Sequence, residues 1–127
     1  MQLSDILAQP VVDREQFEML VETGEDAAAE LIQELLDLFR DESAPRFEML
    51  QESLEKQEAP AIAKHAHSLA GASANLGALR LAKLCRRLEA EAMDGHLEAL
   101  EPLAGHMREQ YQETLNVFEQ EIVKLQA

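Results

Sequence analysis

The chain has 127 residues, 46% of them hydrophobic, which fits one domain with a single core. Its 25 acidic and 11 basic side chains give a formal net charge of −14, which would repel nucleic-acid phosphates and favours protein partners. No stretch approaches the roughly 20 apolar residues of a membrane span, and the N-terminus lacks the features of an export signal. We therefore expect a cytoplasmic protein that binds neither membrane nor nucleic acid.

The N-terminal segment is expected to form short helices. Asp13 is placed to cap one of them, because Gln16 three residues later completes a capping box. Val12 and Phe17 have the spacing of the hydrophobic staple that accompanies such a box. This helix should end near Gly24, since glycine commonly follows a helix end.

Two further helices are expected before Pro60. The first runs from Glu25 to Arg40, and Ser43 is predicted to cap the second, with Pro45 tolerated in its first turn. The apolar side chains of both recur at helical spacing: Leu31, Ile32, Leu35, Leu36, Leu38, Phe39, Phe47, Leu50 and Leu54.

The second half predicts three helices, from Pro60 to Leu76, from Ala78 to about Met93, and a last one that is the longest. Gly77 is expected to end the first of these in a left-handed conformation. The last helix has an apolar stripe typical of a bundle: Leu100, Ala104, Met107, Tyr111, Leu115, Phe118, Ile122 and Leu125. We therefore predict an all-α fold, a four-helix bundle with short additional N-terminal helices, in a single domain over 1–127.

One histidine stands on a helix face that is otherwise made of small residues. At about 100° per residue, five neighbours fall within about 60° of His67: Ala63, Lys64, Ala70, Gly71 and Ala74. Ile62, Leu69 and Leu76 point the other way. His67 should therefore stand exposed above a shallow apolar surface.

The segment 61–89 resembles the signature of the histidine-containing phosphotransfer (HPt) domain family. The matching residues are Ala66-His67-Ser68-Leu69, Gly71, Asn75-Leu76-Gly77-Ala78, Leu81, Leu84-Cys85 and Leu88-Glu89. The resemblance implies a phosphorelay intermediate of a two-component system, in which His67 carries a phosphoryl group between aspartates of receiver domains. Its implied partners are receiver domains of response regulators, a hybrid sensor histidine kinase, or both. It implies a monomeric phosphocarrier, not an enzyme, without cofactor, metal or ATP site.

The small residues around His67 have a chemical reason. A neutral imidazole nitrogen can attack phosphorus without a separate base, provided that a receiver aspartate comes close. A bulky side chain at Gly71 or Ala74 would hold the two surfaces apart, so Ala63, Ala70, Gly71 and Ala74 are expected to form the docking surface. For Gly71, close packing between helices is the alternative explanation.

Charged neighbours are candidates for supporting roles. Glu89 stands where the family often has a glutamine or glutamate that hydrogen-bonds the other ring nitrogen, although it could also be a solvated glutamate. The family commonly has a lysine three residues after the histidine, where this chain has Ala70. Lys64, one turn before His67, would be the substitute cation, or else merely a solvated lysine. Arg86 and Arg87 are weaker candidates for contacting an acidic receiver.

Two alternative functions are compatible with parts of the sequence. An HPt-like adaptor that binds a receiver or kinase without phosphotransfer would explain Ala70, but it has no need of the nucleophile. A metal-dependent or oxidative bundle enzyme would need Glu-x-x-His motifs, which His96 and His106 lack. His65 lies about 160° from His67 and is expected to be structural. The lone cysteine, Cys85, is expected to be a buried apolar residue.

Overall fold

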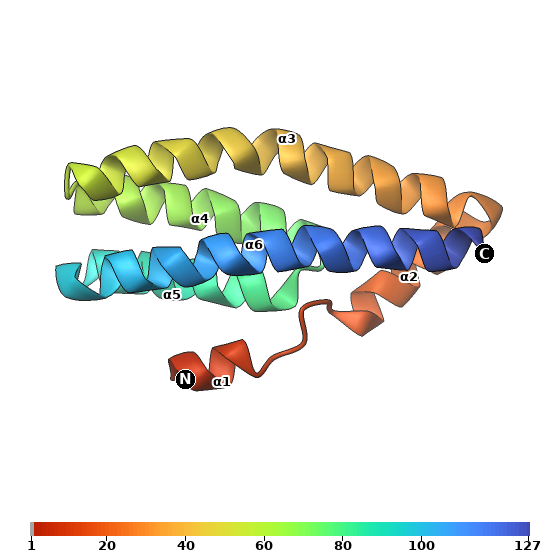
Figure 1. Ribbon diagram of the computed structural model, residues 1–127, viewed down its shortest axis with the longest axis horizontal. Helices are drawn as coiled ribbons and strands as arrows, with labels where there is room; N and C mark the ends of the chain where they lie inside the picture. The colour runs from red at the N-terminus through yellow and green to blue at the C-terminus, as the bar shows by residue number, and fades with distance from the viewer. Residues whose placement is uncertain (1) are drawn as a thin grey trace.

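The computed structural model describes residues 2–127, and over this range it is built from helices (Figure 1). In chain order they are α1 (Leu3–Leu7), α2 (Arg14–Gly24), the 3₁₀ turn η1 (Glu25–Ala27), α3 (Ala28–Glu55), α4 (Ala59–Leu76), α5 (Leu79–Met93) and α6 (Leu97–Gln126). The four long helices form an antiparallel bundle in which α4 packs between α3 and α5, while α6 packs on α5 and α3. The all-α four-helix bundle with additional N-terminal helices is confirmed.

The predicted pair of helices before Pro60 is wrong, because α3 runs unbroken through both segments. Ser43 caps nothing: it is buried inside the helix, where its hydroxyl donates to the Phe39 carbonyl at 2.5 Å and lies 2.9 Å from the Tyr111 hydroxyl. Pro45 stands on the exposed side, so the carbonyl that its missing N–H leaves unpaired faces water. Figure 1 shows α3 bowed outward along its length.

The start of α2 is tied to the turn between α4 and α5. The Asp13 carboxylate accepts a hydrogen bond from the Gln16 backbone N–H at 3.2 Å, as the N-cap prediction requires. The Gln16 side chain, however, does not close the capping box; it donates to the carbonyls of Ala74 and Asn75 at 3.1 and 3.0 Å. The Asp13 N–H donates to the Gly77 carbonyl at 2.9 Å. Gly77 has a φ of +88°, which confirms its predicted left-handed conformation.

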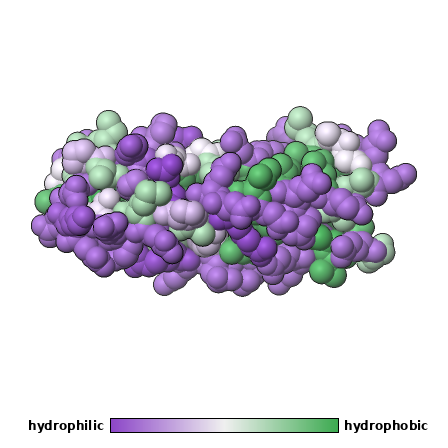
Figure 2. Space-filling view, turned by 90° about the horizontal axis from the view of Figure 1, so that it is seen from above, coloured by the Kyte–Doolittle hydropathy of each residue, from purple (hydrophilic) through white to green (hydrophobic). Residues whose placement is uncertain are grey.

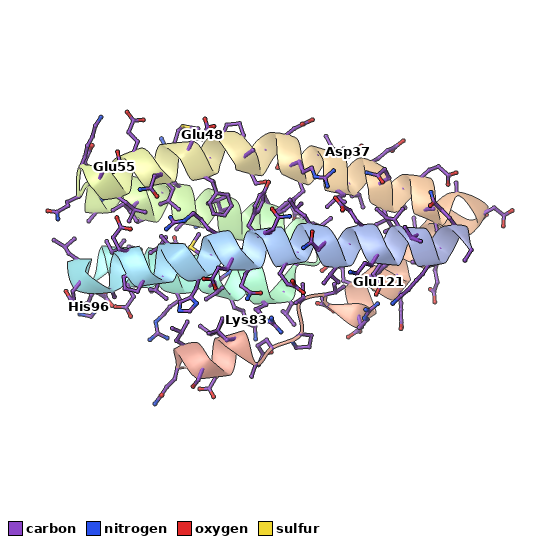
Figure 3. All side chains as sticks on the ribbon, in the orientation of Figure 1. Asp37, Glu48, Glu55, Lys83, His96 and Glu121 are labelled. Atoms are coloured by element: carbon purple, nitrogen blue, oxygen red, sulfur yellow. The ribbon has the colours of Figure 1, made fainter. Side chains whose placement is uncertain are left out.

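A second set of contacts joins α2 to α6. The Arg14 guanidinium donates to the Glu121 carboxylate at 2.5 Å, and the Phe17 ring stacks on the Phe118 ring at a centroid distance of 6.1 Å. Glu121, labelled in Figure 3, is nearly buried, and its hydrogen bond to Arg14 lowers the pKa of its carboxyl. These contacts make the N-terminal segment part of the same packed body as the bundle.

The core runs along the axis of the bundle. Its largest fully buried side chains come from all four long helices: Ile32, Leu36, Leu50, Ile62, Leu69, Leu81, Leu84, Leu88, Met107 and Phe118. Cys85 is fully buried among them, as predicted, and burial raises the pKa of its thiol to about 12. The face seen in Figure 2 is mostly hydrophilic, with hydrophobic area gathered toward the end where α2 lies. Within residues 2–127, no helix combines the length and apolarity that crossing a bilayer requires.

Candidate functional site

His67 stands in the middle of α4, on the side that faces away from the core. Its side chain is 68% exposed, whereas Ile62 and Leu69 of the same helix are buried. Its Nδ1 lies 2.9 Å from Oε2 of Glu89, a residue of the adjacent helix α5. The predicted exposure of His67 and the predicted hydrogen bond to Glu89 are therefore both present in the structure.

This hydrogen bond decides which ring nitrogen is available. A carboxylate oxygen can only accept, so Nδ1 of His67 must carry the hydrogen that is donated to Glu89. In the neutral ring the lone pair is then on Nε2, the nitrogen that points away from Glu89. The arrangement offers one accessible nitrogen nucleophile without a separate base.

His65, two residues earlier, is arranged differently. Its Nδ1 lies 3.2 Å from Nη1 of Arg46, and because guanidinium can only donate, the Nδ1 lone pair is already used. Burial lowers the pKa of His65, and the charges of Arg46 and Lys64 lower it further. The neutral ring then carries its hydrogen on Nε2, so neither nitrogen offers a free lone pair. This agrees with the expected structural role of His65.

The small residues near His67 divide into exposed and buried members. Gly71 is half-buried, and a Cβ atom added there would meet nothing within 4 Å, so the alternative that Gly71 serves close helix packing is wrong. Ala74 is exposed and Ala63 is half-buried. Ala70 is fully buried, so its assignment to an exposed docking surface is also wrong.

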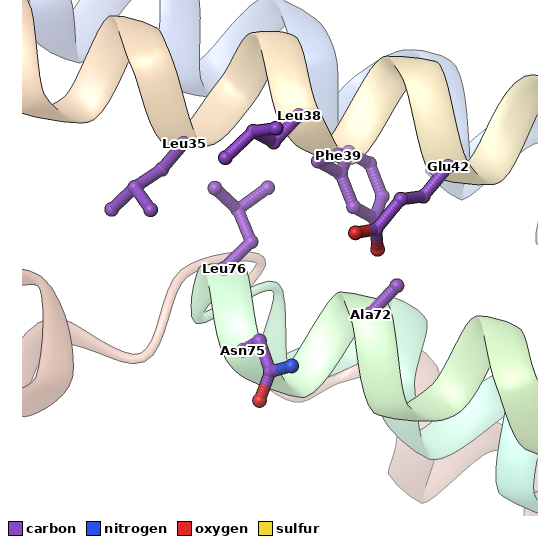
Figure 4. Close-up of a pocket in the computed structure, with 7 residues that line it drawn as sticks. All are labelled: Leu35, Leu38, Phe39, Glu42, Ala72, Asn75 and Leu76. Carbon is purple, nitrogen blue, oxygen red and sulfur yellow. The ribbon is translucent and has the colours of Figure 1, made fainter.

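A shallow hollow lies near the small residues around His67, on the side of α4 that faces α3 (Figure 4). It measures about 180 Å³ and lies between α3 and α4. Its lining residues are Leu35, Leu38, Phe39, Glu42, Ala72, Asn75 and Leu76. Leu38 is 56% exposed, so it gives the hollow an apolar rim. Sequence reasoning placed Leu38 in the core stripe of its helix and missed this hollow, because the helical period alone does not show where α4 ends its contact with α3.

The remaining histidines do not form a metal site. His96 Nδ1 lies 2.7 Å from Glu91 Oε2 at the turn between α5 and α6, and this carboxylate raises the pKa of His96. Over residues 2–127, no group of three or more His, Cys, Asp or Glu side chains is arranged to hold a metal ion. Arg87, named above as a weak candidate for a receiver contact, donates to Glu91 at 3.1 Å.

Comparison with known proteins agrees with this geometry. The Hpt domain model matches residues 34–121, so the chain belongs to the Hpt domain family. Histidine-containing phosphotransfer protein B from Pseudomonas aeruginosa PAO1 is similar in structure, with a TM-score of 0.78 and 32% identity over 92% of this chain and 98% of that one. A putative histidine-containing phosphotransfer protein from rice shares the fold, with a TM-score of 0.73 and 23% identity over 98% of this chain and 89% of that one. No curated protein sequence gives a significant match.

The protein is therefore a phosphocarrier of a His-Asp phosphorelay, and its partners are receiver domains and kinases. This assignment favours phosphotransfer over the adaptor without transfer that the alanine at position 70 suggested.

Proposed function

We propose that His67 is the phosphoryl acceptor of this phosphorelay protein and that Nε2 is the reacting atom. The observation that carries the proposal is the hydrogen bond between Nδ1 and Glu89 at 2.9 Å on a side chain that is otherwise exposed. It fixes the ring so that the free nitrogen faces a partner. His65 has an occupied Nδ1 and a less exposed ring.

The transfer step follows from this arrangement. The Nε2 lone pair of neutral His67 forms the N–P bond, and the P–O bond to the receiver aspartate breaks, so that the aspartate leaves as a carboxylate. The ring keeps its Nδ1 hydrogen and gains a positive charge, which the Glu89 carboxylate faces. In the reverse direction a receiver carboxylate attacks the phosphorus and the N–P bond breaks, so that the neutral imidazole, which still carries its Nδ1 hydrogen, is the leaving group. A divalent cation that assists the step would be held by the receiver domain, the partner with an acidic pocket.

The surface around His67 is suited to the approach of a receiver domain. Gly71 and Ala74 place no large side chain beside the His67 imidazole, and Ala63 continues that face. The hollow between α3 and α4 would take an apolar side chain of the partner. Lys64, exposed one turn from His67, would contact the phosphoryl oxygens.

We further propose that residues 1–127 act as one cytoplasmic, monomeric domain. The contacts of α2 with α6 and with the turn after α4 support a single domain. The exposed large apolar side chains of residues 2–127 are spread over four helices, which favours a monomer: Met19, Leu38, Met49, Met93, Leu97 and Val123. The charge of −14 disfavours binding to nucleic acid or to acidic lipid surfaces.

The test compares His67→Gln with His65→Gln. Each variant is incubated with a phosphorylated receiver domain and, separately, with phosphoramidate, and phosphate that is acid-labile and base-stable is measured on the chain. His67→Gln should abolish labelling with both donors and should keep its helical circular dichroism, because the replaced side chain is exposed. His65→Gln should keep labelling. Labelling that survives in His67→Gln and disappears in His65→Gln would reverse the assignment.

A further inference from the structure

Almost all basic side chains of this protein make a hydrogen bond or ion pair within the chain. The structure describes all eleven of them, and nine make a hydrogen bond or ion pair with another part of the chain: Arg14, Arg40, Arg46, Lys56, Arg80, Lys83, Arg87, Arg108 and Lys124. Among residues 2–127, the two without such a partner are Lys64 and Arg86, and both are exposed. Arg86 is therefore the one arginine of the described residues that makes no hydrogen bond or ion pair within the protein.

Arg86 lies beside the acceptor site, as the register of two helices shows. His67 of α4 is hydrogen-bonded to Glu89 of α5. Seven residues further along α4, Ala74 lines a second hollow, separate from the one between α3 and α4, together with Ala82, which lies seven residues back on α5. The two helices therefore run antiparallel in constant register. Three residues after His67 comes position 70, and three residues before Glu89 comes Arg86, so the two positions face each other.

The residue at position 70 is short and carries no charge. Ala70 is fully buried and ends at its Cβ, so position 70 supplies no cation to the exposed face of α4. Arg86 and Glu89 are one turn apart on α5, and residues at this spacing share a helix face. The hydrogen bond to Glu89 draws the His67 ring toward α5, and thus toward the side on which Arg86 stands.

We propose that the Arg86 guanidinium binds the phosphoryl oxygens of phosphorylated His67, so that α5 supplies the cation that Ala70 cannot supply from α4. The proposal rests on His67 being the acceptor. A phosphoryl group on Nε2 adds two negative charges to a site that already holds the Glu89 carboxylate on the other side of the ring, and a guanidinium matches phosphate oxygens with two parallel N–H donors. Because Arg86 has no partner before the reaction, no ion pair has to break when it binds phosphate. Lys64 stands on the other flank of His67, so the phosphate would lie between two cations.

The test uses phosphoramidate, a donor that needs no partner protein. Its P–N bond breaks and ammonia leaves as Nε2 of His67 forms the new N–P bond. We compare Arg86→Gln with Arg108→Gln, a matched control on α6 that loses one bond to Gln51 and lies across the bundle from α4. Arg86→Gln should be phosphorylated about three to ten times more slowly, or lose its phosphate faster by the same factor, because exposed charged contacts are modest. Arg108→Gln should behave as wild type.

A second readout reports the contact itself. A nearby guanidinium lowers the pKa of the phosphoryl group, so the ³¹P NMR titration of phosphorylated His67 should move to higher pH in Arg86→Gln, and Arg86→Lys should restore part of the difference. Rates, lifetimes and titrations equal to those of Arg108→Gln would overturn the role of Arg86 while leaving His67 as the acceptor. Loss of the proposed function itself has another signature, namely labelling that persists in His67→Gln.

Discussion

The glycine beside the acceptor histidine gives a prediction in which stability and activity change in opposite directions. In Gly71→Leu the new side chain starts from a Cβ that meets nothing within 4 Å, so this atom causes no clash within the protein. Gly71 lies inside α4, and replacing an interior glycine by a good helix former stabilises a helix by about 0.7 kcal/mol. For a domain of this size, the melting temperature should rise by roughly 2–5 °C.

The same leucine should obstruct phosphotransfer from a receiver domain. It projects about 40° from His67 around the helix and adds four carbon atoms to the face that the receiver must approach. The reacting atoms have to come within about 3–3.5 Å, and a displacement of about 1 Å can reduce the rate about a hundredfold. We therefore expect transfer from a phosphorylated receiver to slow by a factor on the order of one hundred. Phosphorylation by phosphoramidate should stay near wild type, because that donor is small.

The assay measures both donors and the thermal melt on one preparation. Gly105→Leu is the matched control: it replaces an interior glycine of α6, where a new Cβ would meet only the end of the Arg108 side chain, at 3.9 Å. It should show the same gain in melting temperature without the loss of transfer. Receiver transfer at the wild-type rate in Gly71→Leu would refute the reasoning and would place the docking surface elsewhere.

Three further predictions concern charge and burial. Lys64→Ala should slow transfer to His67 by about tenfold or less, since exposed contacts to phosphate are modest; unchanged kinetics with several receivers would make Lys64 a solvated lysine. The Glu91–His96 pair should stabilise the fold most between pH 4.5 and 6.5, because the carboxyl pKa is lowered from 4.5 and the imidazole pKa is raised from 6.5. The contribution of the pair is lost as pH falls through the lowered pKa of Glu91 or rises through the raised pKa of His96. His96→Gln should therefore reduce the melting temperature at pH 5.5 more than at pH 9. An equal reduction at both pH values would contradict this. Cys85, buried with a pKa of about 12, should react with iodoacetamide at pH 8 only as the protein unfolds, and rapid labelling of the native protein would contradict its burial.

Much of the fold could be predicted because helical spacing of apolar residues and signals for helix ends are local features of the sequence. The spacing of leucines gave the bundle helices, and Gly77 marked the end of α4 because few other residues adopt a φ of +88°. At the site, the helical period was enough to place His67 on an exposed face. The contact with Glu89 spans two helices, and only the family resemblance, not periodicity, indicated it.

The wrong predictions share one cause. Rules based on residues that are close in the sequence carry no information about which other helix packs against a segment. Pro45 and Ser43 have the signals of a helix start, yet packing of Ser43 against Tyr111 of α6 accompanies one continuous α3. The helical wheel gave the angle between Ala70 and His67 but not which sides of α4 the neighbouring helices bury, and Ala70 lies on a buried side. Gln16 satisfied the capping-box pattern but bonds instead to carbonyls 58 and 59 residues away.

The hydrogen bonds from the Gln16 side chain to the end of α4 affect how a partner docks on this surface. Carbonyls at a helix end are normally satisfied by water, and such ends fray. Here those of Ala74 and Asn75 are held from α2, so the last turn of α4, next to the docking face, is fixed before a partner arrives. Little conformational entropy then has to be lost on docking. A receiver can therefore dock without first ordering the end of α4, so that more of its encounters with this surface reach the geometry that transfer requires.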